Sequence, residues 1–358
     1  MKALAIATVS RSLALQSPRQ WDVLNDLGFE ITFAAGEDDY VEPLERRGTF
    51  VPLALERSIG LGNSRSIVRE IKSLVEGSAW DLVQLQSPVA AAYGRMAIPR
   101  RRGYPVLYVV HGFHFHPDGK PYTNAAAFAA ERMFVRRTDH VAVVAQWDLE
   151  AARRLGYAAE QVTLLPGAGV DLAAFGRPRE HCGTGALLFV GDLNANKNPL
   201  LAIRLMVPLR AQLPTATLLV VGDGPLRTAC SDLIAELGLE DSVQMLHRSD
   251  EVPLLMASSD CLISCSRREG LPRVVIEALA AGIGVAALAN RGTRELLDGG
   301  FGQLLDRGAD ERTWTEAVLA ELNDNSADRV ASRRRHSARW NVEAFSDAYR
   351  SMITAIVN

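Results

Sequence analysis

The sequence predicts an α/β protein of two doubly wound domains, each a parallel sheet covered by helices on both faces. Short apolar runs alternate with amphipathic segments along most of the chain, and glycines and prolines cluster between residues 166 and 185. Strand–helix alternation of this kind is typical of parallel sheets, whose buried strands are continuously apolar. The chain has 358 residues, 48% of them hydrophobic, which is enough for a core in each of two domains.

Five strands are expected in the first half of the chain. Each is a short apolar run of the length that a buried strand usually has. Amphipathic segments such as residues 19–27 and 64–75 lie between the runs and are expected to be helices. The expected strands are residues 4–9, 30–35, 82–86, 106–110 and 140–144.

The second half repeats the alternation after the region rich in glycine and proline, which we interpret as a hinge. Two Rossmann-like domains with a cleft between them are therefore expected, over residues 1–175 and 176–340. Ligands of such sheets bind beyond the carboxyl ends of the strands, so the loops that follow the strands should carry the chemistry. The expected strands are residues 187–190, 217–221, 243–246, 261–264 and 285–289.

The chain ends in a charged, helical segment. Its last part places Phe345, Tyr349, Met352 and Ile356 on one face of a helix. An apolar face of this kind needs a partner, so we expect a C-terminal helix over residues 341–358 that packs back on the first domain.

The charge and cysteine content narrow the class of protein. Lys and Arg number 39 against 42 Asp and Glu, and the net charge of -3 argues against a nucleic-acid partner. Four cysteines are too few for a disulfide framework in a chain of this length, and they suit a reducing cytoplasm. The apolar run at residues 3–9 predicts a first strand rather than a signal peptide, and no run approaches the roughly 18 residues of a membrane span.

The most informative segment is residues 266–282, which predicts a loop, a helix and a glycine stop. Pro272 suits the first turn of a helix, and Gly282 suits its C-terminal end. A helix N-terminus is a ready site for phosphate, and Glu269 and Glu277 flank it with carboxylates that can accept hydrogen bonds from hydroxyls. Either glutamate alone would be interpreted as a solvated acid, whereas the pair suits a sugar nucleotide.

On these residues the chain resembles the family 4 glycosyltransferases, a retaining group with the two-domain GT-B architecture. Glu-Gly-Leu-Pro at 269–272, the second glutamate and the Ala-Gly at 281–282 match the family's signature. The resemblance implies that Glu269 holds hydroxyls of the donor sugar and that Glu277 holds the ribose. The donor-binding residues that it implies in this segment are Glu269, Gly270, Leu271, Pro272, Val274 and Glu277.

Two further segments match the same family in the expected order, at residues 189–198 and 220–225. The resemblance implies that Gly191 contacts the donor and that Lys197 neutralises the leaving diphosphate. Most members have an arginine after the glycine, where this chain has Asp192. Either Lys197 acts alone, or a nearby arginine supplies the missing charge, and the candidates are Arg267, Arg268 and Arg273.

A histidine-rich run follows the expected strand at 106–110. The sequence His-Gly-Phe-His-Phe at residues 111–115 resembles a motif of a branch that builds bacterial exopolysaccharide and capsule, and it implies that His111 lies near the donor sugar. Zinc binding by His111, His114 and His116 is not favoured, because Asp118 is the only carboxylate or cysteine next to them in the sequence. Structural turn histidines are the remaining interpretation, and it is favoured for His114 and His116.

The acceptor side is less well defined. Residues 8–12 lack the glycines that the family often has there, and residues 84–88 carry glutamines where the branch has histidines. A basic cluster could be a solvated helix end, or a patch that faces anionic lipid or a lipid diphosphate at the inner face of the plasma membrane. Its members are Arg95, Arg100, Arg101 and Arg102.

Together these residues predict a glycosyltransferase of the hexosyl type. We expect it to move a sugar from a nucleotide-diphosphate sugar, with UDP favoured, to a hydroxyl of a saccharide or lipid-linked acceptor. His111, Glu269 and Lys197 are the expected catalytic residues. No Asp-x-Asp sequence occurs, so neither a metal nor any cofactor besides the donor substrate is expected. A sugar-nucleotide epimerase and a two-domain solute-binding protein are the alternatives.

Overall fold

The structure is a computed structural model that describes every residue except 17, 56–63, 118 and 178–182. Two compact units make up the described chain: Met1–Gly169 with Val342–Asn358, and Val170–Asn341. The units therefore begin and end at 169/170 and 341/342, not at the expected 175/176 and 340/341. The reason is local pairing, since the Val170 N–H donates to the Trp340 carbonyl and Val170 forms a bridge with Asn341.

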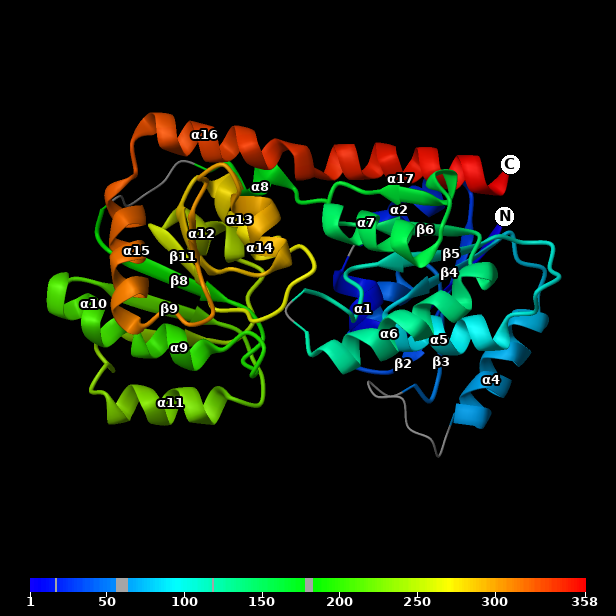
Figure 1. The fold of residues 1–358 in the computed structure, drawn as a ribbon, viewed down its shortest axis with the longest axis horizontal. Helices are drawn as coiled ribbons and strands as arrows, with labels where there is room; N and C mark the ends of the chain where they lie inside the picture. Colours follow the sequence, from blue (N-terminus) through cyan, green and yellow to red (C-terminus); the bar gives the residue numbers. More distant parts are fainter. Residues whose placement is uncertain (17, 56–63, 118, 178–182) are drawn as a thin grey trace. The chain divides into compact units, whose positions relative to one another are not determined.

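The first unit contains a parallel sheet of seven strands in the order β3-β2-β1-β4-β5-β6-β7. Figure 1 labels β2 to β6 of this sheet. The expected strands are all present, and the sequence missed β3 and β7, which are short and partly exposed. The strands are β1 Lys2–Val9, β2 Glu30–Gly36, β3 Thr49–Pro52, β4 Leu82–Gln86, β5 Val106–Val110, β6 His140–Val143 and β7 Val162–Leu164.

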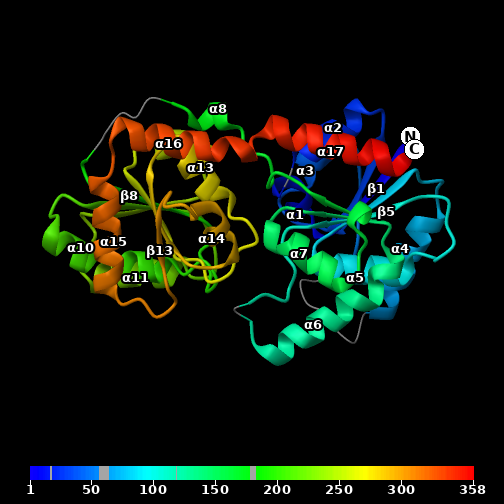
Figure 2. The ribbon, with the colours of Figure 1, turned by 45° about the horizontal axis from the view of Figure 1, so that its top comes forward.

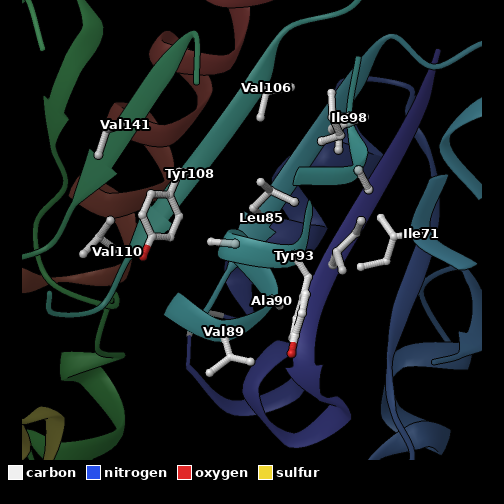
Figure 3. Close-up of a cluster of buried hydrophobic side chains, with 14 of the residues drawn as sticks. Ile71, Leu85, Val89, Ala90, Tyr93, Ile98, Val106, Tyr108, Val110 and Val141 are labelled. Atoms are coloured by element: carbon white, nitrogen blue, oxygen red, sulfur yellow. The ribbon is translucent and has the colours of Figure 1, made fainter. Parts of the chain in front are cut away.

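Helices cover both faces of this sheet. One face packs on α4, α5, α6 and α7, and Figure 3 shows part of that core, where Ile71, Leu85 and Tyr93 lie between α4, β4 and α5. The other face packs on α1, α2, α3 and the C-terminal helix. The helices are α1 Ser10–Leu15, α2 Arg19–Asp26, α3 Val41–Glu45, α4 Ser64–Glu76, α5 Pro88–Ala97, α6 Pro121–Phe134, η1 Val135–Arg137, α7 Gln146–Leu155, η2 Ala159–Gln161 and α17 Val342–Val357.

The C-terminal helix α17 packs within the first unit beside α2 (Figure 2). Phe345, Tyr349 and Met352 are buried, as the spacing predicts, while Ile356 is only partly buried and Ile353 takes its place in the core. The Tyr349 hydroxyl donates a 2.5 Å hydrogen bond to the Oε1 of Gln84 on the central strand β4.

The second unit contains a parallel sheet of six strands in the order β10-β9-β8-β11-β12-β13. The five expected strands are present, and the three-residue β13 was missed. The strands are β8 Ala186–Val190, β9 Thr217–Val221, β10 Val243–Leu246, β11 Cys261–Ser264, β12 Gly284–Leu288 and β13 Gln303–Leu305.

Helices again cover both faces, with α9, α10, α11 and α15 on one and α8, α12, α13 and α14 on the other. Cys230, Cys261 and Cys265 are buried free thiols, and Cys182 lies outside the described residues. The helices are α8 Leu172–Phe175, α9 Pro199–Arg204, α10 Met206–Gln212, α11 Arg227–Glu236, α12 Val252–Ala257, α13 Arg273–Ala281, α14 Arg291–Leu297, α15 Glu311–Asn323, α16 Ala327–Ser337 and η3 Ala338–Trp340. None of the helices within the described ranges is long and apolar enough to cross a bilayer.

A buried ion pair fixes α16 to α15 in the second unit. The Arg333 guanidinium lies 2.7 Å from Glu321 Oε2, and both side chains are fully buried. The same carboxylate oxygen accepts a 3.1 Å hydrogen bond from the Val285 N–H of β12. A buried carboxylate with these two partners cannot be removed without leaving a charge unpaired.

We predict that Glu321→Gln lowers the free energy of unfolding of the second unit by about 3–5 kcal/mol, because the Arg333 charge stays buried without a counterion. The matched control on the same helix is Glu316→Gln, whose exposed partner Arg312 lies 3.7 Å away. That control should cost less than about 0.5 kcal/mol. Urea unfolding measures both, and equal losses would contradict the assignment.

Candidate functional site

The loops at the carboxyl edge of the second sheet meet at its switch point. β8 lies between β9 and β11, so the connections leave it in opposite directions, and ligands of open α/β sheets bind at such a place. The loop after β8 is tied to the loop after β11 by two hydrogen bonds. The Arg267 N–H donates to the Asn196 carbonyl at 2.8 Å, and the Asn196 side-chain amide donates to the Arg268 carbonyl at 3.0 Å.

Glycines allow the backbones at this edge to approach closely. Gly222, after β9, has a φ of +147°, and a Cβ there would lie 2.0 Å from the Gly191 carbonyl oxygen. A side chain at this position would have no room, since the obstacle is backbone. At Gly191 the aliphatic part of the Lys197 side chain lies over the backbone, 3.4 Å from where a Cβ would be, which is an ordinary van der Waals distance.

The turn after Gly191 positions Lys197. The Asn194 side-chain oxygen accepts hydrogen bonds of 3.0 Å from the N–H groups of Asn196 and Lys197, which closes an Asx turn. Asn198 then adopts a left-handed conformation with a φ of +53° before α9 begins. The lysine stem is thereby directed over Gly191.

Lys197 and Glu269 form an ion pair across the two loops. The Nζ of Lys197 lies 2.6 Å from the Oε1 of Glu269, and their side chains are 23% and 14% exposed. The pair is thus partly solvated, so either group can exchange its partner for a substrate group. The structure brings together two of the three expected catalytic residues.

Helix α13 begins beside this pair. Pro272 is its N-cap and has no side-chain group to cap the first N–H groups, which leaves the positive end of the helix for an anion. Gly292 packs against this turn, since a Cβ on it would lie 2.5 Å from the Gly270 carbonyl oxygen. The Arg291 Nε donates a 3.1 Å hydrogen bond to the Glu269 carbonyl. The Glu-Gly-Leu-Pro segment is therefore held by α14.

Glu277 lies one turn inside α13 and is buried. Burial raises the pKa of its carboxyl, and the Arg273 guanidinium, whose Nε lies 2.8 Å from Oε1, opposes the rise. Arg273 is therefore already paired and is not the free substitute cation that the sequence allowed. Arg267 and Arg268 are exposed in the loop before the helix.

The arginine beside Asp192 is Arg248, which the sequence analysis did not identify. Its guanidinium lies 3.3 Å from Asp192, and its backbone N–H donates a 3.1 Å hydrogen bond to the Asp223 carboxylate. Asp223 also accepts from the Nδ1 of His247 at 2.7 Å. Asp192 occupies the position at which most family members have an arginine. The loop after β10 thus places the positive charge of Arg248 beside that position.

In the first unit, His111 lines a cavity of about 140 Å³ at the carboxyl ends of β4 and β5. The other lining residues are Gln16, Ser87, Pro88, Tyr108, Val109, Val110 and Gly112. Ser87 is held in a strained conformation, with a φ of +64°, while its hydroxyl accepts a 3.1 Å hydrogen bond from the Thr8 N–H. Non-glycine residues with positive φ concentrate at functional sites.

The His111 imidazole is buried at its Nε2 atom, which has no hydrogen-bond partner within the described part of the chain. Burial lowers the pKa of His111 to about 4. The ring is therefore neutral at physiological pH and can either donate or accept a hydrogen bond at this atom, depending on its tautomer.

The neighbouring histidines have other surroundings. His114 is exposed, and the backbone of His116 is held by the Asn124 side chain through bonds of 3.2 and 2.6 Å. Phe113 and Phe115 are buried and stacked, with ring centroids 5.1 Å apart. Among the described residues, no three His, Cys, Asp or Glu side chains are grouped as a metal site requires, and Asp118 lies outside them.

The expected basic cluster is only partly a surface feature, and for Arg95 the prediction was wrong. Arg95 is 1% exposed and pairs with Glu131 at 2.8 Å, while its guanidinium lies 4.5 Å from the centre of the Tyr108 ring. Arg102 is ion-paired with Asp139. Arg100 and Arg101 remain exposed.

The glutamines of residues 84–88 form a buried network rather than an open surface. The side-chain amides of Gln84 and Gln86 donate to the Oε1 of Gln20 at 2.9 and 3.0 Å. Gln84 also accepts the hydrogen bond from Tyr349. These hydrogen bonds therefore join α2 and α17 to β4.

Each half of the chain matches a family model of glycosyltransferases. Residues 22–174 match the family model described as Glycosyltransferase Family 4, and residues 180–338 match the one described as Glycosyl transferases group 1. The putative glycosyltransferase EpsD of Bacillus subtilis is 27% identical over 79% of this chain and 77% of its own length. An Escherichia coli galactosyltransferase, described as acting from UDP-Gal on α-D-GlcNAc-diphosphoundecaprenol, is 24% identical over 75% of this chain and 73% of its own.

Solved structures show the same fold. HepE of Anabaena, solved with UDP and glucose, superposes with a TM-score of 0.78 at 19% identity, covering 99% of this chain and all of its own. WaaG, a glycosyltransferase of lipopolysaccharide biosynthesis, superposes with a TM-score of 0.73 at 15% identity, covering 98% of this chain and 99% of its own.

We predict that the His111 imidazole titrates with a midpoint near 4, because protonation would place a charge in a buried site. Below the ordinary histidine pKa the unfolded chain binds a proton that the folded chain does not, so stability falls as the pH drops from about 6.5 towards 4. NMR titration, with His111→Gln to assign the signal, measures the midpoint. A midpoint at or above the ordinary histidine value would contradict this burial.

Proposed function

Since this chain is a glycosyltransferase of the GT-B fold, we propose that it transfers a hexosyl group from a UDP-sugar to a hydroxyl of a saccharide or lipid-linked acceptor. The observation that carries the proposal is the Lys197–Glu269 pair beside the N-terminus of α13. The named activity of the Escherichia coli relative and the UDP in the HepE structure support a UDP-sugar as donor. The acceptor is proposed to belong to cell-surface polysaccharide synthesis.

Each part of the donor has a chemically suitable partner at the edge of the second sheet. The diphosphate would bind the free N–H groups of α13 and the Lys197 ammonium, because both are positive and close together. Glu269 would accept hydrogen bonds from the sugar hydroxyls. Glu277 keeps lone pairs for the ribose hydroxyls after Arg273 has taken one of its oxygens.

The transfer step breaks the bond between the anomeric carbon and the diphosphate oxygen, and the acceptor oxygen forms the new bond. The acceptor hydroxyl loses its proton in the same step, and the departing diphosphate oxygen would accept it. Negative charge develops on the departing diphosphate, where Lys197 and the dipole of α13 would stabilise it without needing to reorient. The positive groups come from the chain itself, so we propose a metal-independent reaction. The proposed retention of configuration rests on the family resemblance.

His111 and Arg248 are proposed to assist. The neutral imidazole of His111 can hydrogen-bond a sugar hydroxyl without attracting the diphosphate. Arg248 would return part of the positive charge that Asp192 takes away, since it is 41% exposed on its side chain and can turn towards an anion.

The proposed function is tested by incubating the protein with UDP-sugars, with and without saccharide or lipid-linked acceptors. UDP release that requires the acceptor supports a transferase. Conversion of the donor sugar to its epimer without any acceptor would indicate the epimerase instead, and binding without turnover would indicate a solute-binding protein.

We predict that Glu277→Ala weakens UDP binding roughly tenfold or more, the size expected for loss of hydrogen bonds to a charged group. The fold should remain intact, because the variant removes a carboxylate whose burial disfavours its charge. Calorimetric titration with UDP measures the loss, and Glu316→Ala is the matched exposed control. Unchanged affinity in Glu277→Ala would overturn the assignment of this carboxylate to the donor.

A further inference from the structure

Helix α6 exposes an apolar face to the outside of the first unit. Tyr122 and Met133 are 67% and 75% exposed, and Ala126 and Ala129 lie between them on the same side of the helix. These positions are separated by four, three and four residues, which places all of them on one stripe. An ordinary surface helix turns polar residues outward, whereas α6 has apolar residues on its outward side as well as on the side that packs against the core.

The inward side of α6 holds the helix in this orientation by polar and aromatic contacts. Glu131, the only acidic residue of the helix, pairs with the buried Arg95 at 2.8 Å. Asn124 bonds the backbone of His116, and Phe128 packs edge-on against Phe115 with ring centroids 5.2 Å apart. The helix therefore cannot turn its apolar stripe inward without leaving Arg95 buried and unpaired.

Cations border the stripe at both ends. Lys120 precedes the helix and lies 5.9 Å from the centre of the Tyr122 ring, and Arg136 is exposed at the other end. Arg132 is also exposed there, but its guanidinium donates a 2.8 Å hydrogen bond to the Leu155 carbonyl. The Arg137 guanidinium donates a 2.9 Å hydrogen bond to the Arg95 carbonyl, which joins this end of α6 to the end of α5 beside it (Figure 2).

The end of α5 adds further groups of the same two kinds. Met96 is 44% exposed, and Arg100 and Arg101 follow it, also exposed. Among the residues that the structure describes at this end of the helix, the exposed carboxylate of Asp139 is paired with Arg102. Exposed apolar side chains and exposed arginines therefore lie close together here, in a chain whose net charge is negative.

We propose that α6 and the end of α5 form a docking surface for a membrane that contains anionic lipid. Tyr122 and Met133 would enter the headgroup region, and the surrounding lysine and arginines would contact lipid phosphates, as in helices that lie in the plane of a bilayer. A symmetric contact with a second copy is disfavoured, because it would oppose the same cations to each other. The inference does not depend on the transfer of sugar.

The test is flotation of the full chain with lipid vesicles. The protein should float with vesicles that contain phosphatidylglycerol and phosphatidylcholine, and should float less with phosphatidylcholine alone. The variant Tyr122→Glu/Met133→Glu should lose flotation. The control, Val207→Glu/Leu254→Glu, changes apolar residues that are 47% and 42% exposed in the second unit and should float as the wild type does.

The charged border is tested separately with Arg100→Gln/Arg101→Gln, which should lower partitioning to the anionic vesicles by roughly fivefold for each charge removed. Wild-type protein that stays unbound, or a Tyr122→Glu/Met133→Glu variant that still floats, would overturn the proposal. The proposal would also be overturned if analytical ultracentrifugation showed that the wild-type protein is a dimer and that Met133→Glu converts it to a monomer. Urea unfolding of each variant, followed by circular dichroism, reports whether the first unit is intact. Flotation requires no nucleotide, so failure here leaves the proposed transfer untouched.

Discussion

The ion pair of Lys197 and Glu269 is the interaction on which the proposed chemistry depends. It joins the loops after β8 and β11, and its 2.6 Å contact is partly open to solvent. The fully buried pair of Arg333 and Glu321 in the same unit provides a contrast, since removing either partner there leaves a charge that water cannot reach. A partly solvated pair loses little when a substrate replaces one partner, which is what a binding site requires.

In both units, the candidate functional residues lie at the carboxyl ends of the strands and are held there by costly local conformations or burial. In the second unit, close approach of glycine backbones and an Asx turn direct a lysine over the edge of the sheet. In the first unit, a strained serine and a desolvated histidine line a cavity at the corresponding edge. Strain and desolvation both cost stability, and the surrounding apolar cores of the sheets offset that cost.

The sequence predicts those parts of the structure that depend on local pattern. Ten of the strands were predicted from short, largely apolar runs, whereas β3, β7 and β13 are only three or four residues long and mostly not buried. The Glu-Gly-Leu-Pro segment and its helix were predicted because loop, helix start and glycine stop are adjacent in the chain.

Contacts between distant segments could not be predicted from the sequence. Arg248 reaches Asp192 only because β10 and β8 lie on either side of β9 in the sheet, although 56 residues separate the two side chains along the chain. Arg95 stands near three other arginines in the sequence, which suggested an exposed basic cluster. Its partner Glu131 comes from another helix, and the two side chains form a buried ion pair. The exposed stripe of α6 could not be predicted either, because the ion pair of Glu131 with Arg95 determines which side of the helix faces inward.

The most direct test of the account is the rate of transfer by Lys197→Met at saturating UDP-sugar, with Lys72→Met on the exposed side of α4 as the matched control. If Lys197 stabilises the departing diphosphate, its removal should lower kcat by about a hundredfold to a thousandfold, as loss of a preorganised charge partner does. A Lys197→Met enzyme that turns over as fast as the control would contradict the account.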